Sequence, residues 1–334
     1  MKKILFISTG GTIVSSDSGD GFEPYYNVEK LVESIKKDDD CVIEGRLLMN
    51  IDSSNMNPIH WIKIAKTIGE NYDKYDSFIV SHGTDTMAYT SSALAYMLEG
   101  LNKPVIITGA QHSIEETYTD AIQNLNDALQ FSLEDIFGVF ISFDGKLING
   151  TRAIKVKTMS YDAFKSINYP FIASIKYGEI RFENGIKELI TQKENDIFNP
   201  SYELNSNIII IKLFPGINPS IFDFAMNNYD GVIIESFGIG GVPFKELDIH
   251  DKVKKLISNG VTVVITTQCF EEGVDLSIYQ VGKKLMNSNI IFAGDMNTEA
   301  IVPKLMCTLG RFDKFSDRKE YFEMPMSDDK KMIV

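Results

Sequence analysis

Short apolar runs alternate with amphipathic segments along the first half of the chain. Four runs end at small or polar residues and lie at 4–8, 77–81, 105–108 and 138–143. Apolar runs of this length are typical of strands buried on both faces of a parallel sheet. Asp144 and Gly145 follow the last run and both tolerate positive φ, which predicts a tight turn into an antiparallel strand. We therefore expect a mostly parallel sheet with an antiparallel addition.

Two helical patterns lie among these strands. Residues 88–98 form the first, and residues 119–130 form the second, with Ile122, Leu125 and Leu129 on one face. This alternation of strand and helix favours an α/β fold.

The second half repeats the alternation more regularly. Strands are expected at 208–213, 231–235, 261–266 and 290–293. Helices are expected at 221–227, 245–257, 277–286 and 298–309. Asn297 is expected to cap the last helix, and Gly310 is expected to lie just past its end. The charged tail after Gly310 is left open between packing on a partner and fraying.

Two domains follow from this pattern. Residues 1–187 are expected to form the larger, mixed-sheet α/β domain. The polar segment 188–207 has no clear period and is interpreted as a linker. Residues 208–334 are expected to form a smaller, doubly wound parallel-sheet domain of flavodoxin-like type.

Charge and cysteine content exclude some partners and compartments. The 334 residues carry a formal net charge of −13, which argues against binding to nucleic acid or to anionic membranes. Cys41, Cys269 and Cys307 are far apart, which favours a reducing compartment. The first apolar run is too short for a signal peptide, and no run is long enough to span a membrane. A cytoplasmic location is therefore expected.

The loops after the strands hold the candidate chemistry, because ligands of open parallel sheets bind at the carboxyl ends of the strands. These loops contain small hydroxyl or amide residues at 10–12, 53–55, 83–85 and 109–111. They suit a small polar ligand. The chain has no phosphate-binding P-loop and no GxSxG serine elbow, and its four histidines are scattered, which argues against a histidine metal site.

Threonine chemistry remains, and each element of it has a structural alternative. Thr12 follows two glycines and would be a nucleophile if a base accepted its proton, but the same residues suit a plain strand-to-helix turn. Residues 84–86 (Thr-Asp-Thr) also suit the cap of the following helix. Lys155, taken alone, reads as a solvated surface lysine.

Taken together, these segments resemble one known family over nearly the whole chain. The matching segments are Gly10-Gly11-Thr12-Ile13, residues 81–87, 107–111, 120–125, 151–158, 162–164 and 168–170, and in the second half 238–243, 267–269 and 294–296. They resemble the bacterial-type L-asparaginases, which use a threonine nucleophile. The segment 52–56 favours the cytoplasmic, type I branch.

The resemblance implies an activity and an assembly. It implies hydrolysis of L-asparagine to L-aspartate and ammonia, with L-glutamine as a side substrate. It implies no cofactor and no metal. It also implies a homodimer or homotetramer with the sites at the intimate dimer interface.

The resemblance further assigns roles to individual residues. Thr12 matches the nucleophile, and Thr84, Asp85 and Lys155 match a second cluster in which a neutral lysine would take the proton of Thr84. Asp85 would meet the α-ammonium of the substrate. The remaining substrate-binding positions are Gly11, Ser53, Ser54, Gly83 and Ala110, with backbone N–H groups near Thr84 and Ala110 as oxyanion donors.

Three positions depart from the family pattern. Phe22 stands where the family places a tyrosine after the loop glycine. Tyr25 or Tyr26 would supply that hydroxyl after a small shift, and Tyr25 is preferred. In some members a second asparagine binds as an allosteric activator, and Cys269 matches one residue of that site. Ile154 and Glu235 replace a threonine and an arginine there, so allostery is expected to be absent or altered. The alternative for Cys269 is a small buried apolar residue.

Two other functions stay open. One is the asparaginase-like subunit of a tRNA-dependent amidotransferase, which releases ammonia for a partner. The early position of Thr12, with no preceding barrel, and the acidity argue against it. The other is a catalytically silent amino-acid sensor, which the retention of Thr12, Thr84, Asp85 and Lys155 argues against.

Overall fold

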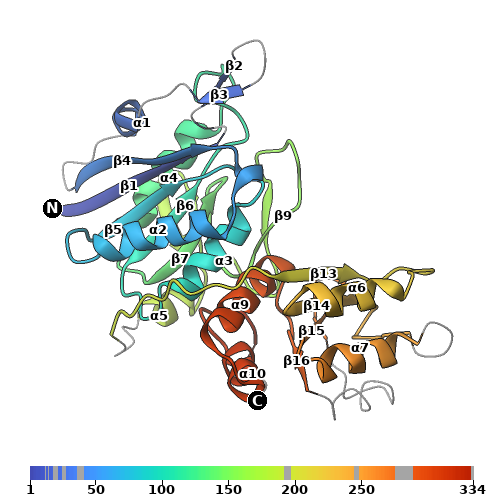
Figure 1. The fold of residues 1–334 in the computed structure, drawn as a ribbon. Helices are drawn as coiled ribbons and strands as arrows, with labels where there is room; N and C mark the ends of the chain where they lie inside the picture. The colour runs from blue at the N-terminus through green and yellow to red at the C-terminus, as the bar shows by residue number, and fades with distance from the viewer. Residues whose placement is uncertain are drawn as a thin grey trace. The chain divides into compact units, whose positions relative to one another are not determined.

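The computed structural model describes the chain except at residues 12, 14, 18–21, 25–27, 36–40, 192–196, 244–247, 275–288 and 332–334. The chain divides into two compact units, Met1–Tyr202 and Glu203–Val334. Each unit has its own sheet (Figure 1). The expected linker at 188–207 stays a prediction.

The first unit is built on a mixed sheet, as expected. Within the described residues its eight strands lie in the order β12 (Glu179–Phe182), β11 (Ala173–Lys176), β8 (Lys146–Asn149), β7 (Gly138–Phe143), β6 (Pro104–Thr108), β5 (Ser77–Ser81), β1 (Lys2–Gly10) and β4 (Cys41–Ile51). The strands from β4 to β7 are parallel, and β8, β11 and β12 pair antiparallel. Asp144 and Gly145 join β7 to β8 with φ of 50° and 70°, which confirms the predicted turn.

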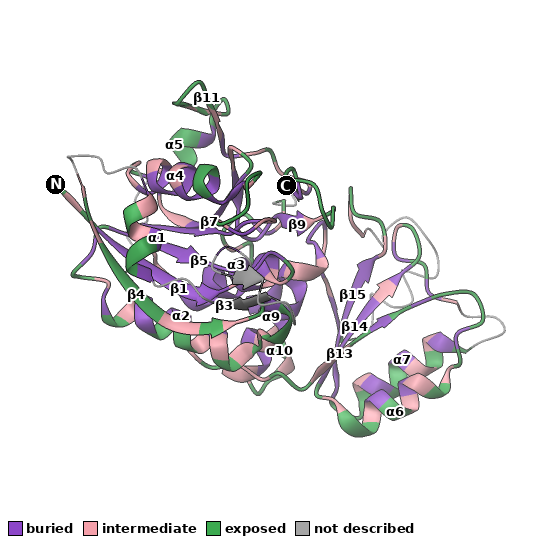
Figure 2. Cartoon of the chain, turned by 90° about the horizontal axis from the view of Figure 1, so that it is seen from above, coloured by how far each residue is buried: buried purple, intermediate pink, exposed green. Residues whose placement is uncertain are grey.

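Burial explains which strands the pattern revealed. Every residue of β5 and β6 is buried, because helices cover both faces of the sheet there. Figure 2 shows the contrast with β4, which lies at the sheet edge and is largely exposed or intermediate. Glu44, Arg46 and Asn50 interrupt its apolar positions, so no long apolar run marked its bounds.

Helices lie on both faces of this sheet. The helices α1 (Val28–Ser34) and α4 (Ala121–Ser132) cover one face, and α2 (Pro58–Glu70) and α3 (Met87–Met97) cover the other (Figure 1). The expected face of α4 is partly wrong, because Ile122 in its first turn is 45% exposed while Leu125 and Leu129 are buried. α2 was not predicted, although Asn57 caps it and Pro58 begins it.

Shorter elements complete the first unit. They are β2 (Ser15–Asp17) paired with β3 (Phe22–Pro24), the 3₁₀ turn η2 (Ser53–Asn55), β9 (Ala153–Lys155) paired with β10 (Phe164–Ser166), and α5 (Ile186–Ile190). The β9–β10 pair is separate from the large sheet and packs beside α3.

The second unit contains the expected smaller parallel sheet. Its strands are β13 (Ile208–Lys212), β14 (Gly231–Ser236), β15 (Thr262–Thr267) and β16 (Ile290–Phe292), paired in chain order. The helices α6 (Ser220–Asn228) and α7 (Ile249–Ser258) lie on one side, and α9 (Thr298–Arg311) and α10 (Phe315–Glu323) on the other (Figure 1). The expected helix at 277–286 falls outside the described residues, and so do residues 245–247 of the expected helix at 245–257.

The end of α9 corrects one prediction. Gly310 does not follow the helix but lies inside it, because α9 continues to Arg311. A Cβ on Gly310 would lie 2.7 Å from the backbone of Glu203 and Leu204, so this glycine permits a close approach of two chain segments. Asn297 does occupy the N-cap position, although its side chain makes no capping hydrogen bond.

The charged tail after α9 packs on the second unit. Tyr321 and Phe322 of α10 are buried. Lys304 and Asp329 form a fully buried ion pair, and the Lys304 ammonium also donates to the carbonyl oxygen of Met324. Burial lowers the pKa of Lys304, and the Asp329 carboxylate opposes that shift. This ion pair holds the segment around Asp329 against α9.

No helix in the described parts of the chain is both long and apolar enough to cross a membrane.

Candidate active site

Three chain segments meet closely at the carboxyl edge of the large sheet. Gly11 follows β1, Ser53 follows β4, and Gly83 follows β5. A Cβ on Gly11 would lie 2.6 Å from the Gly83 Cα, and a Cβ on Gly83 would lie 2.6 Å from the Ser53 Oγ. Gly11 also has a φ of +86°, which disfavours residues with a side chain. Both positions therefore require glycine, and the three segments form one loop cluster.

Lys155 joins this cluster from β9. Its Nζ lies 2.8 Å from the Thr84 Oγ1 and 2.7 Å from an Asp85 carboxylate oxygen. The Lys155 side chain is only 17% exposed, so its interpretation as a solvated surface lysine is wrong. The Asp85 side chain is 64% exposed and keeps acceptor capacity toward solvent.

Ser53 holds the start of this loop through two hydrogen bonds. The Asp85 N–H donates to the Ser53 Oγ over 3.3 Å, and the Thr86 hydroxyl donates to the Ser53 carbonyl oxygen over 2.8 Å. Thr86 occupies the N-cap position of α3 but makes no side-chain capping bond, so its hydroxyl is used across the loops instead. Ser54 is exposed, and its N–H donates to the Asp52 carboxylate rather than to this cluster.

The loop after β6 reaches the same cluster through Gln111. The Thr84 hydroxyl donates to the Gln111 side-chain oxygen over 3.2 Å. The Gln111 side-chain nitrogen donates to the carbonyl oxygens of Thr158 and Ser160. Ala110, the residue before Gln111, is buried in the same loop.

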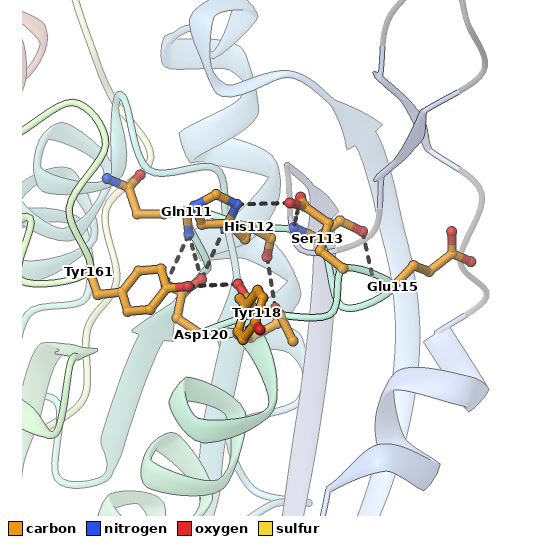
Figure 3. Close-up of polar contacts among 10 residues, drawn as sticks. Gln111, His112, Ser113, Glu115, Tyr118, Asp120 and Tyr161 are labelled. Carbon is orange, nitrogen blue, oxygen red and sulfur yellow. Dashed lines mark hydrogen bonds and ion pairs between the residues drawn. The ribbon is translucent and has the colours of Figure 1, made fainter.

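Asp120 at the start of α4 fixes this loop. Its buried carboxylate accepts from the backbone N–H groups of Gln111 and His112 at 3.0–3.1 Å (Figure 3). The Asn124 side chain bonds both the Asp120 carboxylate and the Gly109 carbonyl oxygen. Charge-assisted bonds to backbone N–H groups are strong, so the peptide around Ala110 is held in one conformation.

His82 lies beneath the cluster and is completely buried. Its Nδ1 lies 2.7 Å from the Gly83 carbonyl oxygen, and its Nε2 lies 2.9 Å from the Thr90 Oγ1. The indole N–H of Trp61 donates to the same Thr90 oxygen over 3.0 Å. Burial lowers the pKa of His82 to about 4, although the bond to Gly83 opposes this shift, so the ring is neutral at physiological pH.

Some predicted site residues are not placed by this structure. Thr12, the expected nucleophile, and Tyr25, the expected lid tyrosine, lie outside the described residues. Cys269 lies in the second unit and is exposed, so its alternative interpretation as a buried apolar residue is wrong. Its relation to allostery stays a prediction.

The predicted residues that the structure does bring together are Gly11, Ser53, Gly83, Thr84, Asp85, Ala110 and Lys155. Sequence reasoning gave no role to Gln111, Asp120 or His82, although all three lie in the segments that carried the resemblance. A lone histidine directly after a buried strand was the available signal for His82.

Two family profiles match the chain. The profile described as "Asparaginase, N-terminal" matches residues 3–188, and "Glutaminase/Asparaginase C-terminal domain" matches residues 207–322. The L-asparaginase of Thermococcus kodakarensis is 36% identical over 323 residues, which cover 96% of this chain and 97% of that protein. The solved structure of the thermostable L-asparaginase from Thermococcus kodakarensis matches with a TM-score of 0.92 at 34% identity, covering 98% of this chain and 99% of that chain.

A second kind of relative is similar over most of the chain. One component of the glutamyl-tRNA(Gln) amidotransferase of Pyrococcus abyssi is 32% identical over 324 residues, covering 93% of this chain and 72% of that protein. One assignment follows from the two matching profiles, the two-unit α/β fold and the loops around Thr84 and Lys155. The chain belongs to the asparaginase family.

Proposed function

We propose that this protein hydrolyses the side-chain amide of L-asparagine to L-aspartate and ammonia, with L-glutamine as a minor substrate. The observation that carries the proposal is the Lys155 ammonium bonded to both the Thr84 hydroxyl and the Asp85 carboxylate. A lysine beside a hydroxyl can take up the proton of that hydroxyl once the lysine is neutral, which is a step that acyl transfer requires.

Substrate recognition is assigned to the exposed part of the cluster. The Asp85 carboxylate is positioned to pair with the α-ammonium of an amino acid, a charge-assisted contact. Ser53 and Gly11 line the same loops and suit the α-carboxylate end, with Ser54 as an outer contact. These small residues leave room for a short polar side chain rather than for an apolar one.

Proton transfer is assigned to Thr84 and Lys155. Substrate binding draws the Asp85 carboxylate toward the α-ammonium and so competes with its ion pair to Lys155. A Lys155 amine that has lost its proton can accept the proton of the Thr84 hydroxyl, as histidine does for serine in other hydrolases. The backbone N–H groups of Thr84 and Ala110 are the candidate donors to the oxyanion of the tetrahedral intermediate.

The nucleophile is assigned to Thr12, with direct attack by water as the alternative route. On the first route the Thr12 oxygen bonds to the amide carbon and loses its hydroxyl proton. The C–N bond then breaks as the nitrogen takes up that proton and leaves as ammonia. Water then cleaves the resulting ester, which releases L-aspartate and returns the proton to Thr12. Tyr25 is the candidate for the lid hydroxyl that Phe22 lacks.

The first experiment measures ammonia and aspartate released from L-asparagine and L-glutamine in separate titrations. Wild type, Thr12→Ala and Thr12→Ser are compared. We expect equal amounts of ammonia and aspartate, loss of release in Thr12→Ala by about 10³-fold or more, and partial activity in Thr12→Ser, which keeps the hydroxyl. Full activity in Thr12→Ala would remove the threonine route and favour direct attack by water.

The second candidate function is the ammonia-releasing component of a tRNA-dependent amidotransferase. The 32% identity to the Pyrococcus abyssi protein over 93% of this chain favours it. The net charge of −13 disfavours a tRNA-facing surface. Retention of labelled tRNA by the purified protein at low salt, with no ammonia released from free asparagine, would support this second function. Amino-acid binding with neither activity would support the sensor function.

A homodimer or homotetramer with sites at the subunit interface is part of the proposal. Exposed apolar side chains next to the site support it, because Tyr118 and Met159 are 83% and 81% exposed and Tyr161 bonds the Tyr118 carbonyl oxygen. Light scattering coupled to gel filtration gives the mass directly, and a monomer at assay concentration would contradict this part. A cytoplasmic location is proposed from the wide spacing of the three cysteines along the sequence.

A further inference from the structure

His82 makes a chain of hydrogen bonds that ends at the Gly83–Thr84 peptide. Its own backbone N–H donates to the Thr108 carbonyl oxygen over 2.8 Å, so β6 fixes its place. One ring nitrogen contacts the Gly83 carbonyl oxygen, and the other contacts the Thr90 hydroxyl. The ring therefore links α3 to the loop that carries the Thr84 hydroxyl.

The partners of the ring determine where each proton lies. A carbonyl oxygen only accepts, so the His82 Nδ1 must carry the hydrogen that is shared with Gly83. The neutral ring then has an acceptor at Nε2, which receives the hydrogen of the Thr90 hydroxyl. The Thr90 oxygen in turn accepts from the indole N–H of Trp61, which can only donate. Each donor in this series of hydrogen bonds therefore has one acceptor, and the series runs from Trp61 through Thr90 and His82 to Gly83.

The direction of the Gly83 carbonyl determines the direction of the next N–H. In a planar trans peptide the C=O and the N–H point to opposite sides, so holding the Gly83 oxygen aims the Thr84 N–H away from His82. Gly83 has no side chain of its own to fix this peptide, so the contact of its carbonyl oxygen with His82 adds a directional constraint to the packing around it. Among the described residues, the Thr84 N–H has no hydrogen-bond acceptor.

We propose that His82 is a positioning residue, which aims the Thr84 N–H at the carbonyl oxygen of a bound amide by holding the Gly83 carbonyl. This inference rests on the proposed amide hydrolysis. The role needs the protonated Nδ1 and the acceptor at Nε2, and it gives no proton to the substrate. An oxyanion donor that is held in place contributes roughly 10²–10³-fold in rate, so a loosened one loses part of that factor.

The kinetic test compares Thr90→Val with Thr90→Ser. Valine has nearly the shape of threonine but no hydroxyl, so it removes the partner of the His82 Nε2 while serine keeps it. We expect Thr90→Val to lower kcat about 10-fold or more with KM changed less than about threefold, and Thr90→Ser to restore most of kcat. Unchanged kcat in a folded Thr90→Val protein would overturn the proposal, and so would an equal loss in both variants.

A second readout needs no activity. The protein has four histidines, so ¹⁵N-histidine labelling gives a simple spectrum, in which the His82 ring is assigned by its loss in His82→Asn. We expect a neutral ring protonated at Nδ1 throughout pH 5.5–8. The amide resonance of Thr84, assigned with Thr84→Ser, should shift in Thr90→Val but not in Thr90→Ser. A ring protonated at Nε2, a ring that titrates in this range, or an unmoved Thr84 amide would overturn the proposal. Absence of ammonia release would contradict the proposed function alone.

Discussion

The ammonium of Lys155 lies 2.7 Å from a carboxylate oxygen of Asp85, yet the two side chains differ greatly in exposure. The lysine is 17% exposed and the aspartate 64%. A cation entering from solvent therefore meets Asp85 first and can share its carboxylate with Lys155. The ion pair is thus placed to respond to the α-ammonium of an amino acid.

Replacing Lys155 by methionine should lower kcat for asparagine hydrolysis by about 10³-fold or more, because the variant keeps the stem but loses the amine beside Thr84. The matched control is Lys157→Met on the same segment, where Lys157 pairs with Asp162 instead of with the cluster. Steady-state ammonia release measures both variants. Near-normal turnover in Lys155→Met would remove Lys155 from its assigned role.

Replacing Gly11 by alanine should abolish most activity, because the new Cβ would lie 2.6 Å from the Gly83 backbone. The control is Gly178→Ala, since Gly178 has a similar φ of +80° but no atom within 4 Å of the new Cβ. Both variants carry the left-handed penalty of roughly 1–2 kcal/mol. We expect at least about a 100-fold lower kcat/KM in Gly11→Ala, with Gly178→Ala close to wild type. Equal activities would mean that the two loops separate easily.

The stability of the second unit should depend on the protonation of Glu299. Burial, with a smaller contribution from Glu235, raises the pKa of Glu299 from 4.5 to about 7. Between these values the folded state holds a proton that the unfolded state has lost. The stability that protonated Glu299 contributes to the folded state is therefore fully present below pH 4.5 and is lost as the pH rises through 7. The free energy of unfolding falls by about 3 kcal/mol over this range.

Glu299→Gln keeps the neutral shape at every pH and so reports this loss directly. Its thermal midpoint in calorimetry should exceed that of wild type at pH 8 and should match it at pH 4.5. Glu271→Gln, which removes an exposed carboxylate, is the control. An increase in the thermal midpoint of Glu299→Gln that is the same at both pH values would contradict the raised pKa of Glu299.

Activation by a second asparagine should be absent. The Glu235 carboxylate accepts from the Thr298 hydroxyl over 2.8 Å, and its side chain is only 13% exposed. Glu299 adds a second carboxyl group beside it. An α-carboxylate brought to this place would meet the Glu235 carboxylate, which already pairs with the nearby Lys212 ammonium at 3.7 Å. Initial rates should therefore follow a hyperbola in asparagine concentration, and a sigmoidal curve would contradict the prediction.

The sequence revealed the central strands because burial on both faces leaves a continuous apolar run. The runs predicted at 77–81 and 138–143 coincide with the observed bounds of β5 and β7. The edge strand β4 left no such run, because solvent reaches much of it. A hydrophobic pattern reveals a strand only when the same degree of burial extends along the whole strand.

The loop residues of the site could be predicted from the sequence, but the contacts that hold these loops in place could not. Glycine and threonine after a strand mark Gly83 and Thr84 as candidates from sequence alone. The burial of Lys155 was not predictable, because it depends on the separate β9–β10 pair, which brings the lysine against Thr84. The contacts of Asp120 and His82 are likewise tertiary, and no local pattern encodes them.

Trp61 is the one tryptophan in the sequence, and its indole lies in the hydrogen-bond chain that leads to the Gly83–Thr84 peptide. Trp61 is therefore an intrinsic fluorescent probe of this loop. The intrinsic fluorescence of this indole depends on its buried surroundings and on the acceptor at Thr90. Its emission would follow ligand binding at the loop, and unfolding of the first unit, without any attached dye.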